Sequence, residues 1–85
     1  MNKQTQYEIL FLNEMLNNNC WNGKHMNEQY VLKRVKHLPP KEKKQALKAW
    51  NKLLTEGLVL RKPSKKEFQV SLNSQKKAEI EKLII

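Results

Sequence analysis

Residues 41–66 read KEKKQALKAWNKLLTEGLVLRKPSKK, and their periodicity changes at Gly57. Before this glycine, apolar residues recur at the spacing of one helix face; after it, apolar and polar residues alternate as in a β-strand. The same stretch carries a net charge of +7 out of the chain's +9, whereas residues 1–40 carry +2 and residues 67–85 carry none. Positive charge focused on one helix and one hairpin is typical of a surface that lies against a polyanion.

The helix in this stretch is predicted over residues 40–56, with Pro40 in its first turn and Gly57 directly after its last residue. One side should pack on the core, and its apolar residues are Ala46, Leu47, Trp50, Leu53 and Leu54. The opposite side should meet the polyanion, and its residues are Lys41, Lys44, Gln45, Lys48 and Lys52. Because Trp50 shares the spacing of the leucines, we expect it in the core rather than stacked on a nucleotide base.

A β-hairpin is predicted over residues 58–72, with its turn at residues 63–66 and one face on the core. Four cations lie close to the turn, and they are Arg61, Lys62, Lys65 and Lys66. Such side chains can follow phosphates or enter a narrow minor groove. Charged residues also protect a hairpin edge from aggregation, which is the simpler interpretation.

Three further helices are predicted around this stretch. The first covers about residues 4–17 and is apolar over more of its surface than a helix with one buried side requires. The second begins with Asn27 as its N-cap and ends before the two prolines at residues 39–40. Its buried face should contain Tyr30, Val31, Val35 and Leu38. The last covers about residues 74–84, so the chain is predicted to be mainly α with a small β-hairpin, in one domain over residues 1–85.

This order of elements resembles a winged helix-turn-helix domain. The most specific match is Glu56-Gly57-Leu58-Val59, which is similar to the end of the recognition helix and the start of the wing in small bacterial and archaeal transcriptional regulators of the multidrug-resistance type. The resemblance implies a recognition helix at residues 40–56, a wing at residues 58–72 and a short strand near residues 24–26 that pairs with the wing. Residues 39–43, PPKEK, depart from the family, which usually has Ser, Thr or Arg at the start of this helix.

The resemblance implies binding of double-stranded DNA, through the lysine side of the helix and the four hairpin cations. Gln45 has an amide that can read adenine, whereas lysines neutralise phosphates and position a protein without specifying sequence. A solvated helix face is the simpler interpretation of the lysines. Two other functions stay open: a winged-helix subunit that binds a protein partner, and RNA binding, for which the chain shows no aromatic platform.

The apolar C-terminal residues 83–85, which follow Lys82, and the wide apolar surface of the first helix predict a homodimer through the first and last helices. Two recognition helices would then lie about one DNA turn apart. The alternative is that both helices only complete a small core.

Several classes of protein are not expected from this composition. Cys20, the single cysteine, forms no internal disulfide and, with His25 and His37, supplies too few ligands for structural zinc. The chain has no aspartate and no glycine-rich phosphate loop, so we expect no enzyme activity, cofactor or small-molecule substrate. Residues 9–12 form the longest apolar run, too short to span a membrane, and residues 1–3 begin no signal peptide. A cytoplasmic protein is the simplest expectation.

Overall fold

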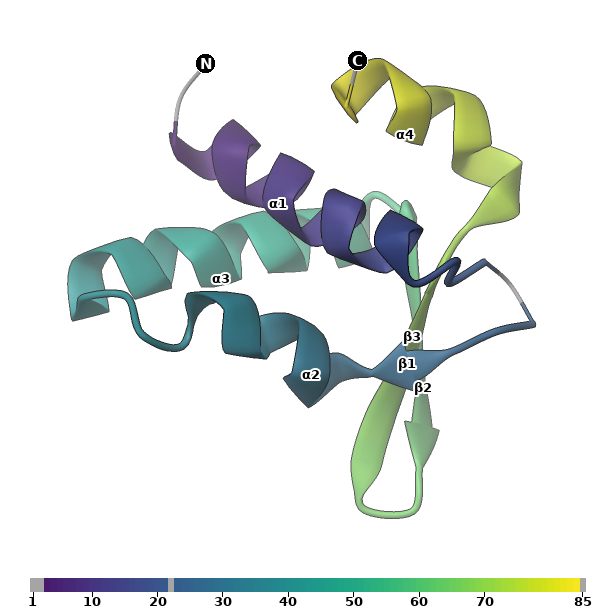
Figure 1. Cartoon of the computed structure of the whole chain (residues 1–85), viewed down its shortest axis with the longest axis horizontal. Helices are drawn as coiled ribbons and strands as arrows, with labels where there is room; N and C mark the ends of the chain where they lie inside the picture. The colour runs from purple at the N-terminus through teal and green to yellow at the C-terminus, as the bar shows by residue number, and fades with distance from the viewer. Residues whose placement is uncertain (1–2, 22, 85) are drawn as a thin grey trace.

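Four α-helices and a small three-stranded antiparallel sheet make up the described part of the chain (Figure 1). The computed structural model describes residues 3–21 and 23–84, so Met1, Asn2, Asn22 and Ile85 lie outside it. The elements in chain order are α1 (Lys3–Asn17), β1 (Met26–Asn27), α2 (Glu28–Leu32), α3 (Pro40–Thr55), β2 (Val59–Ser64), β3 (Glu67–Leu72) and α4 (Lys77–Ile84). Two 3₁₀ turns, η1 (Lys33–Val35) and η2 (Ser74–Lys76), follow α2 and precede α4.

The ends of α2 and α3 follow from local chemistry. Asn27 caps α2, because its side chain accepts a hydrogen bond from the backbone N–H of Gln29 at 2.8 Å. Gly57 ends α3 with a φ of +74°, a value that glycine adopts without strain. The backbone N–H groups of Gly57 and Leu58 then donate to the carbonyls of Leu54 and Leu53, which satisfies the last turn of the helix. The predicted start of α2 and the predicted end of α3 are confirmed to within one residue, whereas α2 ends at Leu32, before the predicted stop at the two prolines.

The sheet has the strand order β1-β3-β2. β2 and β3 form the predicted hairpin, in which Val59 lies opposite Leu72 and Arg61 opposite Val70. The turn is shorter than predicted, because Pro63 and Ser64 belong to β2 and only Lys65 and Lys66 connect the strands. β1 pairs with β3 through Met26 opposite Val70; it overlaps the strand expected near residues 24–26 and is shifted by one to two residues toward the C-terminus.

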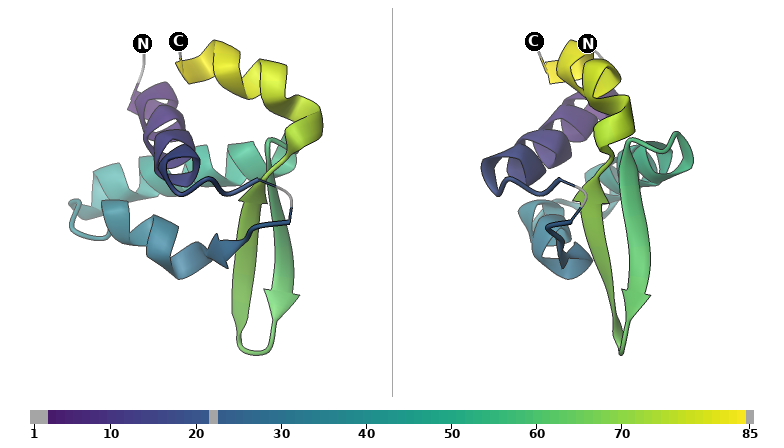
Figure 2. Two further views of the ribbon diagram at one scale, coloured as in Figure 1. Left: turned by 45° about the vertical axis from the view of Figure 1, so that its right-hand side comes forward. Right: turned by 90° about the vertical axis from the view of Figure 1, so that its right-hand side faces the viewer.

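The helices pack around a core on one face of the sheet. At its centre the rings of Phe11 and Trp50 meet edge to face, with 5.1 Å between centroids, which confirms Trp50 as a core residue. The sheet contributes Val59, Val70 and Leu72 to this core. The hairpin turn projects beyond the helices, and the start of α1 and the end of α4 lie on the opposite side of the molecule (Figures 1 and 2).

Two residues predicted for the core lie at its edge instead. Tyr30 is 53% exposed and Leu47 is 38% exposed. The core side of α3 contains Ala49 along with Ala46, Trp50 and Leu53, so its centre lies away from Leu47. On α2, Val31 faces the core, and its neighbour Tyr30 is turned away by about the 100° that separates successive helix residues.

Candidate nucleic-acid interface

The exposed side of α3 carries most of the lysines that the sequence predicted for it. Lys41, Lys44 and Lys48 are exposed at helical spacing, together with Leu47, Asn51 and Thr55. Neighbours on this side are three or four positions apart, so their side chains form one continuous strip. Within residues 3–21 and 23–84, no ion pair involves these three lysines.

Gln45 and Lys52 lie on the flank of α3 that faces α1 rather than in the middle of the exposed side. Lys52 Nζ is 3.8 Å from Oε2 of Glu8, a buried carboxylate on α1. Burial raises the pKa of Glu8, and the positive charge of Lys52 partly opposes this effect. Gln45 lies two turns before Lys52 on the same flank; it is half-buried, and its Oε1 is buried without a hydrogen-bond partner among the described residues. The expectation of a freely exposed Gln45 is therefore wrong.

Arg61 is an exposed residue of β2 whose guanidinium binds a buried carboxylate. Glu28, at the start of α2, is 5% exposed, and its Oε2 accepts hydrogen bonds from Trp50 Nε1 at 2.7 Å and from Arg61 Nε at 3.0 Å. A further ion pair joins Arg61 Nη2 to the same oxygen. The guanidinium also lies 4.8 Å from the centroid of the Phe68 ring, a cation–π contact. This network joins α2, α3 and β2, and it leaves Arg61 less free to bind an external phosphate.

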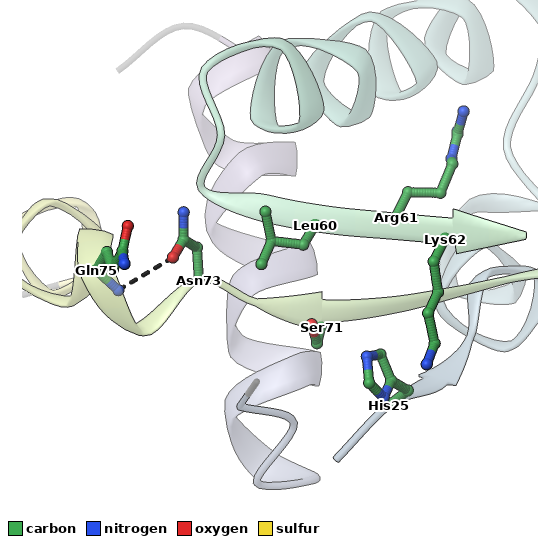
Figure 3. A pocket seen from close by; sticks show the side chains of 7 residues that line it. All are labelled: His25, Leu60, Arg61, Lys62, Ser71, Asn73 and Gln75. Carbon is green, nitrogen blue, oxygen red and sulfur yellow. Dashed lines mark hydrogen bonds between the residues drawn. The ribbon is translucent and has the colours of Figure 1, made fainter. Parts of the chain in front are cut away.

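The other three hairpin cations point into solvent. Lys62 leaves the strand on the side opposite to Arg61 (Figure 3). Lys65 and Lys66 form the turn itself, where Lys65 has a φ of +50°. All three are exposed, and the described residues provide none of them with an ion-pair partner. The predicted site thus divides into six exposed, unpaired lysines, two cations held by carboxylates, and the half-buried Gln45.

A shallow pocket of about 480 Å³ lies on the outer face of the sheet beside Lys62 (Figure 3). Its polar lining residues come from four segments: His25 before β1, Arg61 and Lys62 on β2, Ser71 on β3, and Asn73 and Gln75 after β3. Asn73 is already engaged, because its Oδ1 accepts from the Gln75 N–H and its Nδ2 donates to the Gly57 carbonyl. The pocket is therefore an open hollow that places His25 and Gln75 beside Lys62.

A basic groove between η1 and α3 was not predicted from the sequence. Lys33, Lys36 and Lys43 line it together with Leu47. The signal was present in the sequence, because Lys43 and Leu47 are four residues apart and thus share a side of α3. The exposed amide of Asn51 was missed in the same way, although it is three residues after Lys48.

The surface predicted for a dimer is less apolar than the sequence suggested. The large hydrophobic residues that are exposed in the described part of the chain are Tyr30, Leu47, Leu60 and Phe68. None of them lies on α1 or α4, where Leu16, Leu83 and Ile84 pack against the core. Ile85 lies outside the described residues. A homodimer stays a prediction.

Other chemistry is sparse in the described residues. Cys20 is buried, and its thiol lies 3.2 Å from the carbonyl oxygens of Lys24 and Val70. Burial raises the pKa of this thiol. Over residues 3–21 and 23–84, no three His, Cys, Asp or Glu side chains gather as metal ligands. None of the described helices has the length and apolar character needed to cross a bilayer.

No family model, curated protein or solved structure matches the chain. The function is therefore inferred from the charge and geometry of the surface.

Proposed function

We propose that the chain is a winged helix-turn-helix domain that binds double-stranded DNA, most simply as a small transcriptional regulator. In this proposal α3 is the recognition helix and the hairpin of β2 and β3 is the wing. The order of elements and the pairing of β1 with β3 support the fold. The observation that carries the function is the set of six exposed lysines without carboxylate partners in the described residues: Lys41, Lys44, Lys48, Lys62, Lys65 and Lys66.

The dimensions of α3 suit the major groove. Its 16 residues span about 24 Å at 1.5 Å per residue, and the groove is about 12 Å wide, enough for one helix. Lys44 and Lys48 lie in the middle of its exposed strip, from which they reach phosphates on either side. Lys65 and Lys66, at the projecting turn of the hairpin, bind the adjacent backbone or the minor groove.

Six phosphate contacts predict a strong dependence on salt. Each neutralised phosphate releases condensed counterions, so log affinity should fall with log salt with a slope of about −5. Between 50 and 200 mM salt the affinity for random-sequence duplex should fall about 1000-fold. Lys52 and Arg61 are left out of this count because Glu8 and Glu28 hold them.

The test is fluorescence anisotropy with random-sequence duplex across a salt series. Lys44→Glu combined with Lys48→Glu should weaken binding and make the salt slope shallower by about 2. A matched control is Lys77→Glu with Lys82→Glu, which changes the net charge equally but places the change on exposed positions of α4. If the two pairs weaken binding equally, α3 is not the interface. If the wild-type chain does not bind duplex at 50 mM salt, the proposal fails.

A second function, binding of a protein partner, is favoured by the exposed aromatic rings of Tyr30 and Phe68. Aromatic residues on a surface are enriched at protein interfaces. This function becomes the better explanation if duplex DNA does not bind. RNA binding is distinguished by competition between duplex DNA and a structured RNA for the same lysines.

A further inference from the structure

Leu47 is a large apolar side chain that stands exposed among lysines. It is 38% exposed on α3, between Lys43 and Lys44 on one side and Lys48 on the other. Leu47 lies at the edge of the lysine strip, where it also lines the groove with Lys33, Lys36 and Lys43. A leucine in this position is explained if the surface it meets is itself partly apolar.

Asn51 lies one helical turn after Leu47 on the same exposed strip. Residues four positions apart on a helix have Cβ atoms about 5–6 Å apart, so the two side chains are direct neighbours. Asn51 is exposed, and no residue of the described chain forms a hydrogen bond with its amide. Its donor and its acceptor are both free for a ligand.

The major groove presents one base pair that matches both side chains. Adenine offers the N7 acceptor and the N6 donor, which an asparagine amide binds through two hydrogen bonds, and thymine offers an apolar C5 methyl group. Lysine acts as a point charge and, in contrast, favours phosphates or guanine. Gln45, the other amide on α3, is half-buried with its Oε1 enclosed, so it is not available for this role.

We infer that Leu47 and Asn51 read A·T base pairs in the major groove. Leu47 contacts the thymine methyl group, while Asn51 Nδ2 donates to adenine N7 and Asn51 Oδ1 accepts from adenine N6. The inference rests on the proposed DNA binding and adds a sequence class to it. The surrounding lysines hold the backbone and contribute affinity but no sequence preference.

The experiment starts from the duplex that the wild-type chain selects most tightly from a random pool. Each thymine is replaced in turn by deoxyuridine, which removes only the methyl group, and each adenine by 7-deazaadenine, which removes only N7. Wild-type binding should weaken about fourfold at one deoxyuridine, the value of one buried methyl, and about tenfold at one 7-deazaadenine.

Two variants then assign each effect to one side chain. Leu47→Ala should lose the response to deoxyuridine and keep the response to 7-deazaadenine, and Asn51→Ala should do the reverse. Leu60→Ala removes a similarly exposed leucine, 43% exposed on the hairpin, and should keep both responses. All three positions are exposed, so the folds should survive, which thermal unfolding checks.

The outcomes separate this inference from the proposed function. If the wild-type chain binds DNA tightly but responds to neither modified base, the inference that it reads A·T pairs is wrong. The same holds if Leu47→Ala and Asn51→Ala respond to the modified bases as the wild type does. Both outcomes leave the proposed DNA binding in place. Failure to bind any duplex overturns both.

Discussion

The carboxylate of Glu28 accepts a hydrogen bond from the indole Nε1 of Trp50 at 2.7 Å, which ties the first turn of α2 to the buried side of α3. The same oxygen binds Arg61 of β2. One carboxylate thus connects the proposed recognition helix, the helix before it and the proposed wing. Hydrogen bonds to a charged group in a buried site are stronger than neutral ones, so this oxygen fixes the position of the hairpin relative to α3.

Glu28→Gln should lower the free energy of unfolding by about 2 kcal/mol. The amide keeps an acceptor for the Trp50 N–H, but it removes the negative charge that Arg61 faces and places N–H groups near a cation. Urea denaturation measures the change, with the m-value expected to stay constant. Glu81→Gln, at an exposed position of α4, should change stability by no more than about 0.5 kcal/mol. If both substitutions lower the free energy of unfolding equally, the hydrogen bonds and ion pair of Glu28 do not stabilise the fold more than an exposed glutamate does.

The order of the elements, the start of α2 and both ends of α3 could be predicted because their signals are local. Asn27 caps α2, Pro39 precedes α3, Pro40 is the first residue of α3, and Gly57 lies just after its end. Each of these residues acts on the backbone next to it. The buried role of Glu28 could not be predicted. A glutamate in the first turn of a helix is usually an exposed partner of the helix dipole, and only the approach of Trp50 and Arg61 from distant segments encloses it.

The candidate site was predicted only in part, because the core side of α3 was placed incorrectly. The prediction included Leu47 and Leu54 in the buried side of α3. This turned the predicted centre of the buried side by roughly 50° around the helix axis, half of the angle between successive residues. Because of this rotation, Gln45 was assigned to the exposed side of α3 and Asn51 was not. Alanines give a weak signal in such a pattern, yet Ala49 is fully buried and defines the true direction. The ion pair of Lys52 with Glu8 depends on how α1 packs against α3. The spacing of residues within α3 gives no information on that packing.

Arg61 and Lys62 should separate stability from DNA binding. They are consecutive, carry the same charge and point to opposite sides of the hairpin (Figure 3). Arg61→Gln should lower the free energy of unfolding by about 1–2 kcal/mol, since it leaves Glu28 without its cation, and should change the salt slope of DNA binding little. Lys62→Gln should leave stability within about 0.5 kcal/mol and make the slope shallower by about 1. The reverse pattern, measured by urea denaturation and anisotropy, would place Arg61 on the DNA.

Gly57→Ala should destabilise the chain by about 1 kcal/mol through the backbone alone. No atom outside the neighbouring residues lies within 4 Å of where the new Cβ would stand, so steric contact adds nothing. The φ of +74° is the source of the strain, because a left-handed conformation costs an L-residue about 1–2 kcal/mol. Gly23→Ala is the matched control, since its site is equally open and has no φ in this range. A thermal unfolding scan should show a lower Tm for Gly57→Ala only, and equal values would rule out strain at the end of α3.

Glu8 should make the chain less stable as the pH rises. Burial raises the pKa of this carboxyl above its ordinary 4.5, so between pH 4.5 and the raised value the folded chain binds more protons than the unfolded chain. The free energy of unfolding contributed by this group therefore falls across that window and stays low above it. Glu8→Gln removes the effect, so the stability of the variant relative to the wild type should increase from pH 4.5 upward.

Glu42 provides a control of opposite sign for this measurement. Its hydrogen bond and ion pair with Lys3 lower its pKa below 4.5, so it stabilises the fold above pH 4.5, and this contribution is lost as the pH falls through the lowered value. Urea denaturation of the wild type, Glu8→Gln and Glu42→Gln from pH 3 to 8 should therefore give two difference curves that slope in opposite directions, in adjacent pH windows. If Glu8→Gln follows the wild type at every pH, the pKa of Glu8 is not raised in the folded chain, and the positive charge of Lys52 offsets the effect of burial.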